Sequence, residues 1–134
     1  MDDIPAWVTQ LHSPLDAKLG LELVEVTAER VVGRMPVDGN QQPFGLLHGG
    51  ATGVLVETLA SLGAAAHARD SGRVAVGVDL HVTHLAPVRE GLVTGTAMAV
   101  RLGRTTSHHR VEVRDERDRV TAVGALTCQL VDVS

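Results

Sequence analysis

Residues 49–66 read GGATGVLVETLASLGAAA, and this stretch decides the fold. It is too long and too rich in alanine and leucine for a strand, and it is apolar on nearly every side. These features predict a helix that is buried on most of its faces. The sequence DSG at residues 70–72 ends the helix. Such a helix needs a surface that covers it, and the rest of the chain supplies strands.

Short apolar segments with a period of two lie on both sides of this stretch. A loop rich in Gly, Asn, Gln and Pro covers residues 38–47, immediately before the helix. The segments predict strands at residues 19–26, 31–37, 74–85, 92–102, 105–114 and 120–131. Because short turns join most neighbouring strands, an antiparallel sheet is favoured. The expected fold is therefore α+β, in the order β-β-α-β-β-β-β, with a curved antiparallel sheet wrapped around one long central α-helix.

Length and composition fit one domain that covers residues 1–134. The chain has 44% apolar and 21% charged residues, so it is able to bury a core and is not expected to be disordered. Residues 1–18 form a lead-in to this domain. We expect a helix over residues 3–17 that ends near Ser13-Pro14, with one apolar face made of Trp7, Val8 and Leu11.

The charge balance and the cysteine content narrow the function classes. Sixteen acidic against twelve basic residues give a net charge of −4 without a dense basic run, which disfavours nucleic-acid binding. Cys128 is the single cysteine, so an intramolecular disulfide is excluded and a reduced, cytoplasmic location is expected. We expect no signal peptide, because Asp2 and Asp3 stand where one needs positive charge. No stretch is typical of a membrane span.

Glu57 is the only Lys, Arg, Asp or Glu between Gly39 and Ala68. A carboxylate in the middle of an apolar helix is costly unless it is paired or hydrated. Either Glu57 faces solvent, or the fold holds it buried in a cleft for acid–base or nucleophilic chemistry, and its apolar neighbours favour the cleft. Ser61 lies one turn further along the same face. Its hydroxyl either binds a water or substrate there, or is a small group tolerated in a packed helix.

His48-Gly49-Gly50 stands at the start of the helix. Free backbone N–H groups and the positive end of the helix dipole favour an oxygen that gains negative charge there, as in an oxyanion hole. Gly49 and Glu57 are separated by ~12 Å along a helix, so one helix cannot bring both to the same carbonyl. If they cooperate, two antiparallel helices must meet at a two-fold interface. The sequence therefore predicts a dimer with two equal sites.

Other chemistries are disfavoured by the residue pattern. His81 and His84 are three apart on a strand and point to opposite faces, so they cannot share a metal ion. His108 and His109 likewise point apart, and no metal is expected. The helix lacks the Gly-x-Ser-x-Gly pattern of a serine nucleophile, and the chain has no P-loop. Cys128 lies on an apolar strand face and is expected to be a buried, inert thiol.

Three segments closely resemble the hotdog-fold acyl-CoA thioesterases: residues 35–38 (MPVD), 42–51 (QPFGLLHGGA) and 57–61 (ETLAS). Within that family they look most like enzymes of the phenylacetate-degradation type, such as 4-hydroxybenzoyl-CoA thioesterase and the 1,4-dihydroxy-2-naphthoyl-CoA thioesterase of menaquinone synthesis. The resemblance covers about residues 18–131 and implies a hotdog fold. It also implies hydrolysis of an aromatic acyl-CoA to free acid and coenzyme A, without a metal or cofactor, by a homotetramer built from homodimers.

The resemblance implies a role for each matching residue of the catalytic site. Glu57 matches the catalytic carboxylate, acting as nucleophile or as general base, and Gly49 matches the glycine whose N–H polarises the thioester carbonyl. Gln42 matches the amide beside that carbonyl. His48 matches the histidine of the His-Gly-Gly motif, and Ser61 matches the hydroxyl that helps to position water.

His84 matches a histidine that contacts the substrate, and its place on the strand supports this independently. Even spacing puts His84 on the same strand face as five apolar residues, and we expect this face to meet the helix. The five residues are Val74, Val76, Val78, Leu80 and Val82. His81 falls on the opposite face and is expected at the surface.

The resemblance also implies which residues hold the acyl and CoA groups. Besides His84, they are Gly50, Leu85, Pro87, Arg89, Arg101, Leu102, Gly103, Arg104, Thr105 and Thr106. Ala86 stands where close relatives carry an arginine available to a CoA phosphate, so Arg89 or Arg104 is expected to take its place. Two alternatives stay open: a non-catalytic acyl-CoA-binding hotdog protein, and a thioesterase for medium- or long-chain aliphatic acyl-CoA.

Overall fold

The computed structural model describes residues 3–133, so the first two residues of the expected lead-in lie outside the described residues. The N-terminal part contains the helices α1 (Ala6–Thr9) and α2 (Pro14–Leu19) and the strands β1 (Glu22–Val26) and β2 (Arg30–Pro36). The long helix α3 (Gly49–Arg69) comes next. Four strands follow it: β3 (Arg73–His84), β4 (Leu92–Leu102), β5 (Thr106–Arg114) and β6 (Val120–Asp132). The α+β element order expected from the sequence is confirmed.

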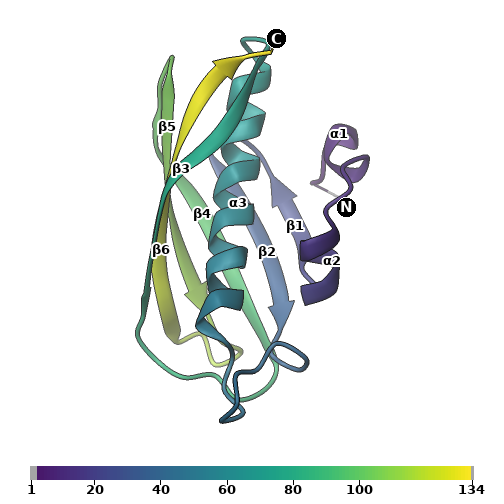
Figure 1. Cartoon of the computed structure of the whole chain (residues 1–134), viewed down its shortest axis with the longest axis vertical. Helices are drawn as coiled ribbons and strands as arrows, with labels where there is room; N and C mark the ends of the chain where they lie inside the picture. The colour runs from purple at the N-terminus through teal and green to yellow at the C-terminus, as the bar shows by residue number, and fades with distance from the viewer. Residues whose placement is uncertain (1–2, 134) are drawn as a thin grey trace.

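The six strands form one antiparallel sheet in the order β1-β2-β4-β5-β6-β3. The sheet curves around α3, and α1 and α2 lie beside β1, at one side of α3 (Figure 1). The strands β1 and β3 are the two edges of the sheet. Among the described residues, no helix is long and apolar enough to cross a membrane.

The core lies between α3 and the concave face of the sheet. One face of α3 is fully buried there, because leucine, valine and alanine recur every three or four residues along it. Its fully buried side chains are Leu55, Val56, Leu59, Ala60, Ala64 and Ala68. The opposite side of α3 is covered only in part, by α1 and α2, and this leaves room for a cavity.

The expected single helix at residues 3–17 is wrong. Two short helices are present instead, and Pro14 begins α2 rather than ending a helix, with Ser13 as its N-cap residue. Proline is well suited to the first position of a helix, because it lacks an N–H that would be unsatisfied there anyway. The side chain of Val8 is buried, as its place on the apolar face predicts.

The expected single apolar face of even-numbered residues 74–84 is wrong in its first half. A β-bulge between Gly77 and Asp79 shifts the register of β3 against β6. After the bulge, residues 80, 82 and 84 pair with helix-facing positions of β6, as expected. Before it, Ala75 and Gly77 take the helix-facing positions, so residues 74 and 76 point away from α3. One extra residue therefore reverses the alternation on which the prediction depends.

Candidate functional site

The first turn of α3 leaves one backbone N–H without a partner among the described residues. His48 is the N-cap, and its Nδ1 accepts a hydrogen bond of 2.8 Å from the N–H of Gly50. The N–H groups of Ala51 and Thr52 donate to the carbonyl oxygen of His48, at 3.0 and 3.2 Å. The N–H of Gly49 is the remaining donor at the positive end of the helix. It is therefore the amide placed to stabilise an oxygen that gains negative charge.

The side chain of Gln42 is oriented by its own loop. Its Oε1 accepts hydrogen bonds from the N–H groups of Phe44, at 2.6 Å, and Leu46, at 3.1 Å. Since backbone N–H groups can only donate, these contacts fix which end of the amide is the oxygen. The Nε2 group has no protein partner among the described residues, so it is available as a donor.

Gln42, Gly49 and His84 line one cavity of about 240 Å³. His84 lies at the end of β3, opposite the buried Ala122 of β6, and so faces α3. A β-carbon added to Gly49 would lie 2.9 Å from Nε2 of His84. Only glycine allows the ring to lie this close to the helix start. The structure thus brings His84 next to Gln42 and Gly49, which lie at least 35 residues earlier in the sequence.

Glu57 is exposed in the single chain, so the expectation of a carboxylate buried within the chain is wrong. The reason is its position at the border of the sheet, beside the edge strand β3, where a β-carbon on Gly77 would lie 3.2 Å from Oε2 of Glu57. Glu57 and Ser61 both line a second cavity of about 720 Å³, bounded on its other side by α1 and α2. Their common position one helical turn apart agrees with the sequence spacing.

Glu57 and Gly49 do not meet within one chain. The helix α3 is continuous from Gly49 to Arg69, and the two cavities have no lining residue in common. The separation of ~12 Å expected from the helical rise therefore applies. A single chain carries both halves of the candidate site, in two different places.

The residues expected to touch the CoA arm, Arg101 to Thr106, lie at the other end of the molecule. They form the end of β4, the β4–β5 turn and the start of β5, near the C-terminal end of α3 (Figure 1). His67 of α3 donates from Nε2 to the carbonyl oxygen of Gly103, at 2.6 Å, and Arg73 donates to that of Arg104, at 2.8 Å. The fold does not bring this turn to Gly49 of the same chain.

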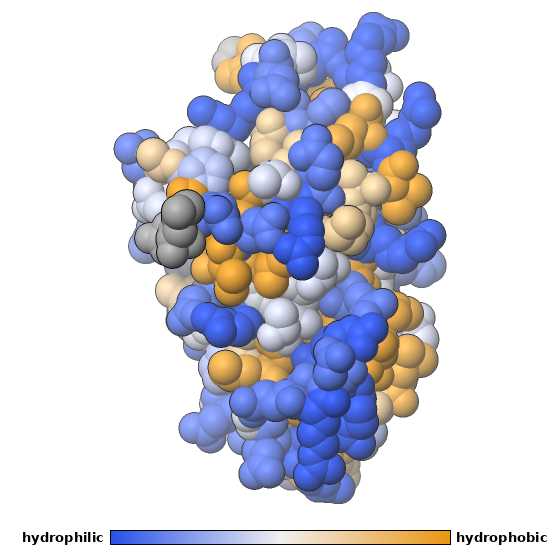
Figure 2. Space-filling view, turned by 180° about the vertical axis from the view of Figure 1, so that it is seen from behind, coloured by the Kyte–Doolittle hydropathy of each residue, from blue (hydrophilic) through white to orange (hydrophobic). Residues whose placement is uncertain are grey.

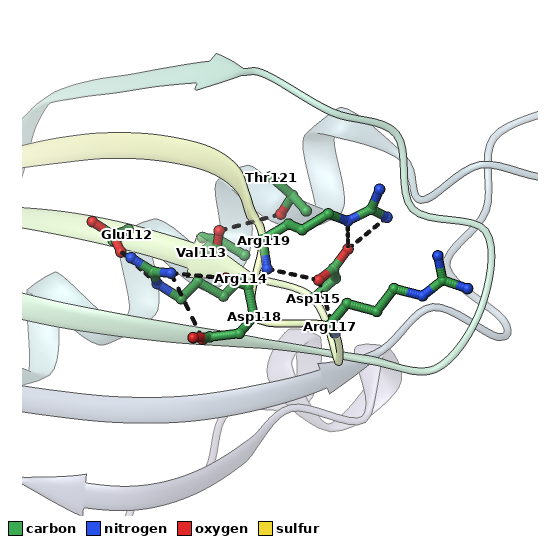
Figure 3. A network of polar contacts seen from close by, with 8 residues as sticks. All are labelled: Glu112, Val113, Arg114, Asp115, Arg117, Asp118, Arg119 and Thr121. Carbon is green, nitrogen blue, oxygen red and sulfur yellow. Dashed lines mark hydrogen bonds and ion pairs between the residues drawn. The ribbon is translucent and has the colours of Figure 1, made fainter.

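Pro87 and Arg89 line a third cavity, of about 360 Å³, together with Arg117 and Arg119 of the β5–β6 turn. Figure 3 shows Arg119 paired with Asp115, while the side chain of Arg117 extends away from that carboxylate. Hydrogen bonds from Arg119, first from its backbone N–H, lower the pKa of Asp115. Arg117 and Arg119 were not expected at a site, since nothing in the local sequence pattern distinguishes them from solvated turn residues.

Leu85 and Gly50 line neither the cavity at Gly49 nor the cavity at Glu57. The side chain of Leu85 is exposed, although its N–H donates to the carbonyl oxygen of Thr121. The N–H of Gly50 donates a hydrogen bond to Nδ1 of His48. Its backbone donor is thus already used by the helix cap.

The two histidine pairs point apart as predicted. His109 is fully buried and faces α3, whereas His108 bonds the hydroxyl of Thr127 at 2.8 Å. His81 is exposed. Within residues 3–133, no group of three or more His, Cys, Asp or Glu side chains is arranged to hold a metal ion.

Cys128 is almost fully buried, as expected. Burial raises the pKa of the Cys128 thiol. A reactive thiolate is therefore disfavoured at this position.

Several known proteins are similar to this chain in sequence and in fold. Residues 44–122 match the model of the thioesterase superfamily. A Deinococcus radiodurans protein named as an esterase is 44% identical over 123 residues, covering 92% of this chain and 77% of that protein. A Listeria monocytogenes protein named 1,4-dihydroxy-2-naphthoyl-CoA hydrolase is 34% identical over 114 residues, covering 84% of this chain and 92% of that protein. The crystal structure of a Haemophilus influenzae thioesterase has a TM-score of 0.83 at 34% identity, covering 88% of this chain and 82% of that one.

Proposed function

Because this chain belongs to the thioesterase superfamily, and is a thioester hydrolase with the hotdog fold of that family, we propose that it hydrolyses acyl-CoA at sites shared by two subunits. Water is consumed, the bond between the acyl carbon and sulfur breaks, and free acid and coenzyme A are released. The observation that carries the proposal is the division of the site. The unpaired N–H of Gly49 and the oriented carboxamide of Gln42 lie in one cavity, and the carboxylate of Glu57 lies in another.

The N–H of Gly49 and Nε2 of Gln42 are the groups that polarise the thioester carbonyl. Both are donors without a protein partner among the described residues, and both line the same cavity. As negative charge develops on the carbonyl oxygen, these fixed donors stabilise it without reorganisation. His84 borders the same cavity and limits the room for the substrate beside Gly49.

Glu57 of the partner subunit supplies the base or the nucleophile. Its carboxylate either removes a proton from the attacking water or attacks the carbonyl carbon to give an anhydride that water then opens. Ser61, on the same cavity wall, is placed to hold the water in either route.

The edge strand β3 is the surface at which two copies pair. It has no neighbouring strand on its outer side, and Val74, Val76 and Val78 of β3 are 45%, 49% and 58% exposed. Figure 2 shows apolar surface along the right-hand border, the side on which β3 and β6 lie in this view. Antiparallel pairing of two β3 strands continues the sheet and satisfies its open hydrogen bonds. It also sets the two α3 helices antiparallel, so that the amide site of one subunit approaches Glu57 of the partner subunit.

Replacing Glu57 with Gln tests the catalytic assignment. We expect Glu57→Gln to lower kcat by roughly 10²-fold or more, measured by thiol release from a panel of acyl-CoA thioesters. Because Glu57 is exposed, the thermal midpoint should stay close to that of the unaltered protein. Near-normal turnover by a folded variant would overturn the proposal. Tight acyl-CoA binding without thiol release by the unaltered protein would instead support the non-catalytic alternative.

Mixing two inactive variants tests the shared site. Glu57→Gln and Gln42→Ala chains are unfolded together at equal amounts and refolded. Random pairing makes half of the dimers mixed, each with one intact site, so about a quarter of the original activity is expected to return. No recovery in a sample shown to contain mixed dimers would mean that each site is built within one chain.

Three finer points remain predictions. The family resemblance favours an aromatic acyl group and a place in menaquinone synthesis, and one relative is named for 1,4-dihydroxy-2-naphthoyl-CoA. A homotetramer of two such dimers is expected, and sedimentation measures it directly. The expected location is the cytoplasm. The aliphatic wall of the Glu57 cavity favours a second candidate substrate, an aliphatic acyl-CoA.

A further inference from the structure

A wide cavity lies between α3 and the two N-terminal helices. Its volume is about 720 Å³, within the range of about 300–1,000 Å³ that is usual for ligand sites. Most of its wall is aliphatic, and the side chains that matter here are Leu11, Leu15, Leu21, Leu23, Val54 and Leu62. Leu11 and Leu15 are 54% and 53% exposed in the single chain. Large apolar side chains left open on one wall of a cavity mark a surface that a ligand covers.

We propose that this cavity is the acyl subsite and that it takes a flexible aliphatic chain rather than an aromatic ring. The inference rests on the proposed function, since Glu57 and Ser61 line the same cavity. A thioester carbonyl placed at the Glu57 carboxylate has its acyl group next to the aliphatic wall. The wall comes from α1, α2, β1 and α3, so it is present in each chain before any partner is added.

Apart from the exposed His12, the cavity lacks the groups that recognise an aromatic ring. Ring binding favours offset or edge-to-face contact with other rings, or a cation over the ring face. The chain has only two large aromatic side chains, and neither lines the cavity. The ring of Trp7 lies under the guanidinium of Arg69, 4.5 Å from the ring centroid. Phe44 is 82% exposed in the loop before α3.

The polar groups of the cavity are largely used by the protein itself. Asp16 accepts a hydrogen bond of 2.8 Å from the hydroxyl of Thr58 and one of 2.7 Å from that of Ser13. The bond from Thr58 ties α2 to α3, and the bond from Ser13 lies within the first turn of α2. A ring hydroxyl would have to compete with them for Asp16. The other polar neighbours are Glu57 and Ser61, which belong to the proposed catalytic site, and His12, which is exposed to solvent.

Chain-length dependence tests the inference. The assay compares butanoyl-, octanoyl- and decanoyl-CoA with benzoyl-CoA by kcat/KM. We expect kcat/KM to rise by up to about fourfold per added methylene while the chain fills the cavity. Decanoyl-CoA should exceed benzoyl-CoA. A preference for benzoyl-CoA, or no dependence on chain length, would overturn the inference.

A pair of matched variants locates the effect. Leu15→Gln makes the wall polar at an exposed position, where the fold tolerates a polar side chain. It should lower kcat/KM for decanoyl-CoA by roughly tenfold, with little change for butanoyl-CoA. Leu92→Gln changes an exposed leucine that lines none of the three cavities and should leave both values unchanged. Equal losses for both substrates in Leu15→Gln would contradict the assignment.

A binding measurement separates this inference from the proposed function. Calorimetric titration compares decanoate with benzoate, without any thioester. Decanoate should bind with a negative heat-capacity change, benzoate more weakly, and Leu15→Gln should weaken decanoate binding. If no acyl-CoA is hydrolysed but decanoate still binds in this way, the proposed function fails and the cavity assignment stands. If hydrolysis occurs but decanoate does not bind, the cavity assignment fails alone.

Discussion

A β-carbon added to Gly77 of β3 would lie 3.2 Å from Oε2 of Glu57 on α3. Gly77 stands beside the β-bulge and occupies a helix-facing position opposite the buried Cys128. The missing side chain at this position gives the carboxylate its room. The bulge and the glycine, both in β3, thus shape the space around the carboxylate of Glu57. Neither belongs to the sequence motifs of the helix.

Gly77→Ala should disturb catalysis more than substrate binding. The added methyl group forces the flexible end of Glu57 to shift by a few tenths of an ångström. Small misplacements of a reacting group are costly, so we expect kcat to fall roughly tenfold with a smaller change in KM. Gly53→Ala is the matched control, because a β-carbon there meets nothing within 4 Å. Equal kcat values for the two variants would show that the contact has no catalytic consequence.

Gln42 offers a way to separate loop structure from hydrogen-bond donation. Gln42→Glu keeps an oxygen that can accept from the N–H groups of Phe44 and Leu46, but it removes the donor and adds negative charge. We expect kcat to fall by about 10²-fold or more, the usual loss when one oxyanion donor is removed, while the thermal midpoint stays nearly unchanged. Gln42→Ala should lose activity and also some stability. If Gln42→Glu retains activity, Nε2 is not the donor.

The cap at His48 predicts a stability effect. Its Nδ1 satisfies the N–H of Gly50, so His48→Ala leaves that donor without a protein partner. Loss of an N-cap side chain costs about 1 kcal/mol, and we expect this decrease in the free energy of unfolding measured in urea. His48→Asn supplies another good capping residue and should restore most of the loss. A value for His48→Ala equal to that of the unaltered protein would contradict the capping role.

His109 predicts a loss of stability in mild acid. Its ring is fully buried, its Nε2 donates to the carbonyl oxygen of Ala28 at 2.8 Å, and its Nδ1 has no partner within residues 3–133. Burial lowers the pKa of His109 below its ordinary value of 6.5. The unfolded chain therefore binds the proton at a higher pH than the folded chain does. Stability from this residue is complete above pH 6.5 and falls as the pH decreases below it.

The measurement compares unfolding free energies at pH 7.5 and 5.5 for the unaltered protein and His109→Gln. The variant has no imidazole to protonate at this position, so its free energy of unfolding should fall less between pH 7.5 and pH 5.5. The difference between the two proteins should be at most about 1.4 kcal/mol per pH unit. The rest of the chain is identical in the two proteins, so its contribution cancels in the difference. Parallel pH profiles would show that His109 does not contribute.

Much of the fold could be predicted because its signals are local. The apolar stretch at residues 49–66 lies inside α3, and the alternating segments coincide with the six strands to within a few residues. Spacing alone also placed Glu57 and Ser61 on one side of the helix and kept Gly49 away from both. His84 could be assigned to the helix-facing side because no bulge separates it from Leu80.

The prediction failed where one residue changes the pattern or where distant segments meet. The bulge beside Gly77 reversed the alternation at residues 74–76, and no composition signal announces it. The lead-in broke into two helices at Pro14. The third cavity, with Arg117, required the β5–β6 turn to lie beside the loop at residues 86–90.

The sequence by itself determined the order of the elements and excluded an intramolecular disulfide. It also determined that one carboxylate follows the glycine-rich helix start by eight residues. These properties depend on neighbours along the chain. Only the tertiary structure decided that Glu57 is exposed, that the Gln42 amide presents its nitrogen, and that α1 and α2 leave an aliphatic cavity beside α3. Exposure, orientation and cavities depend on which remote surfaces come into contact, and that information is set by packing rather than by local spacing.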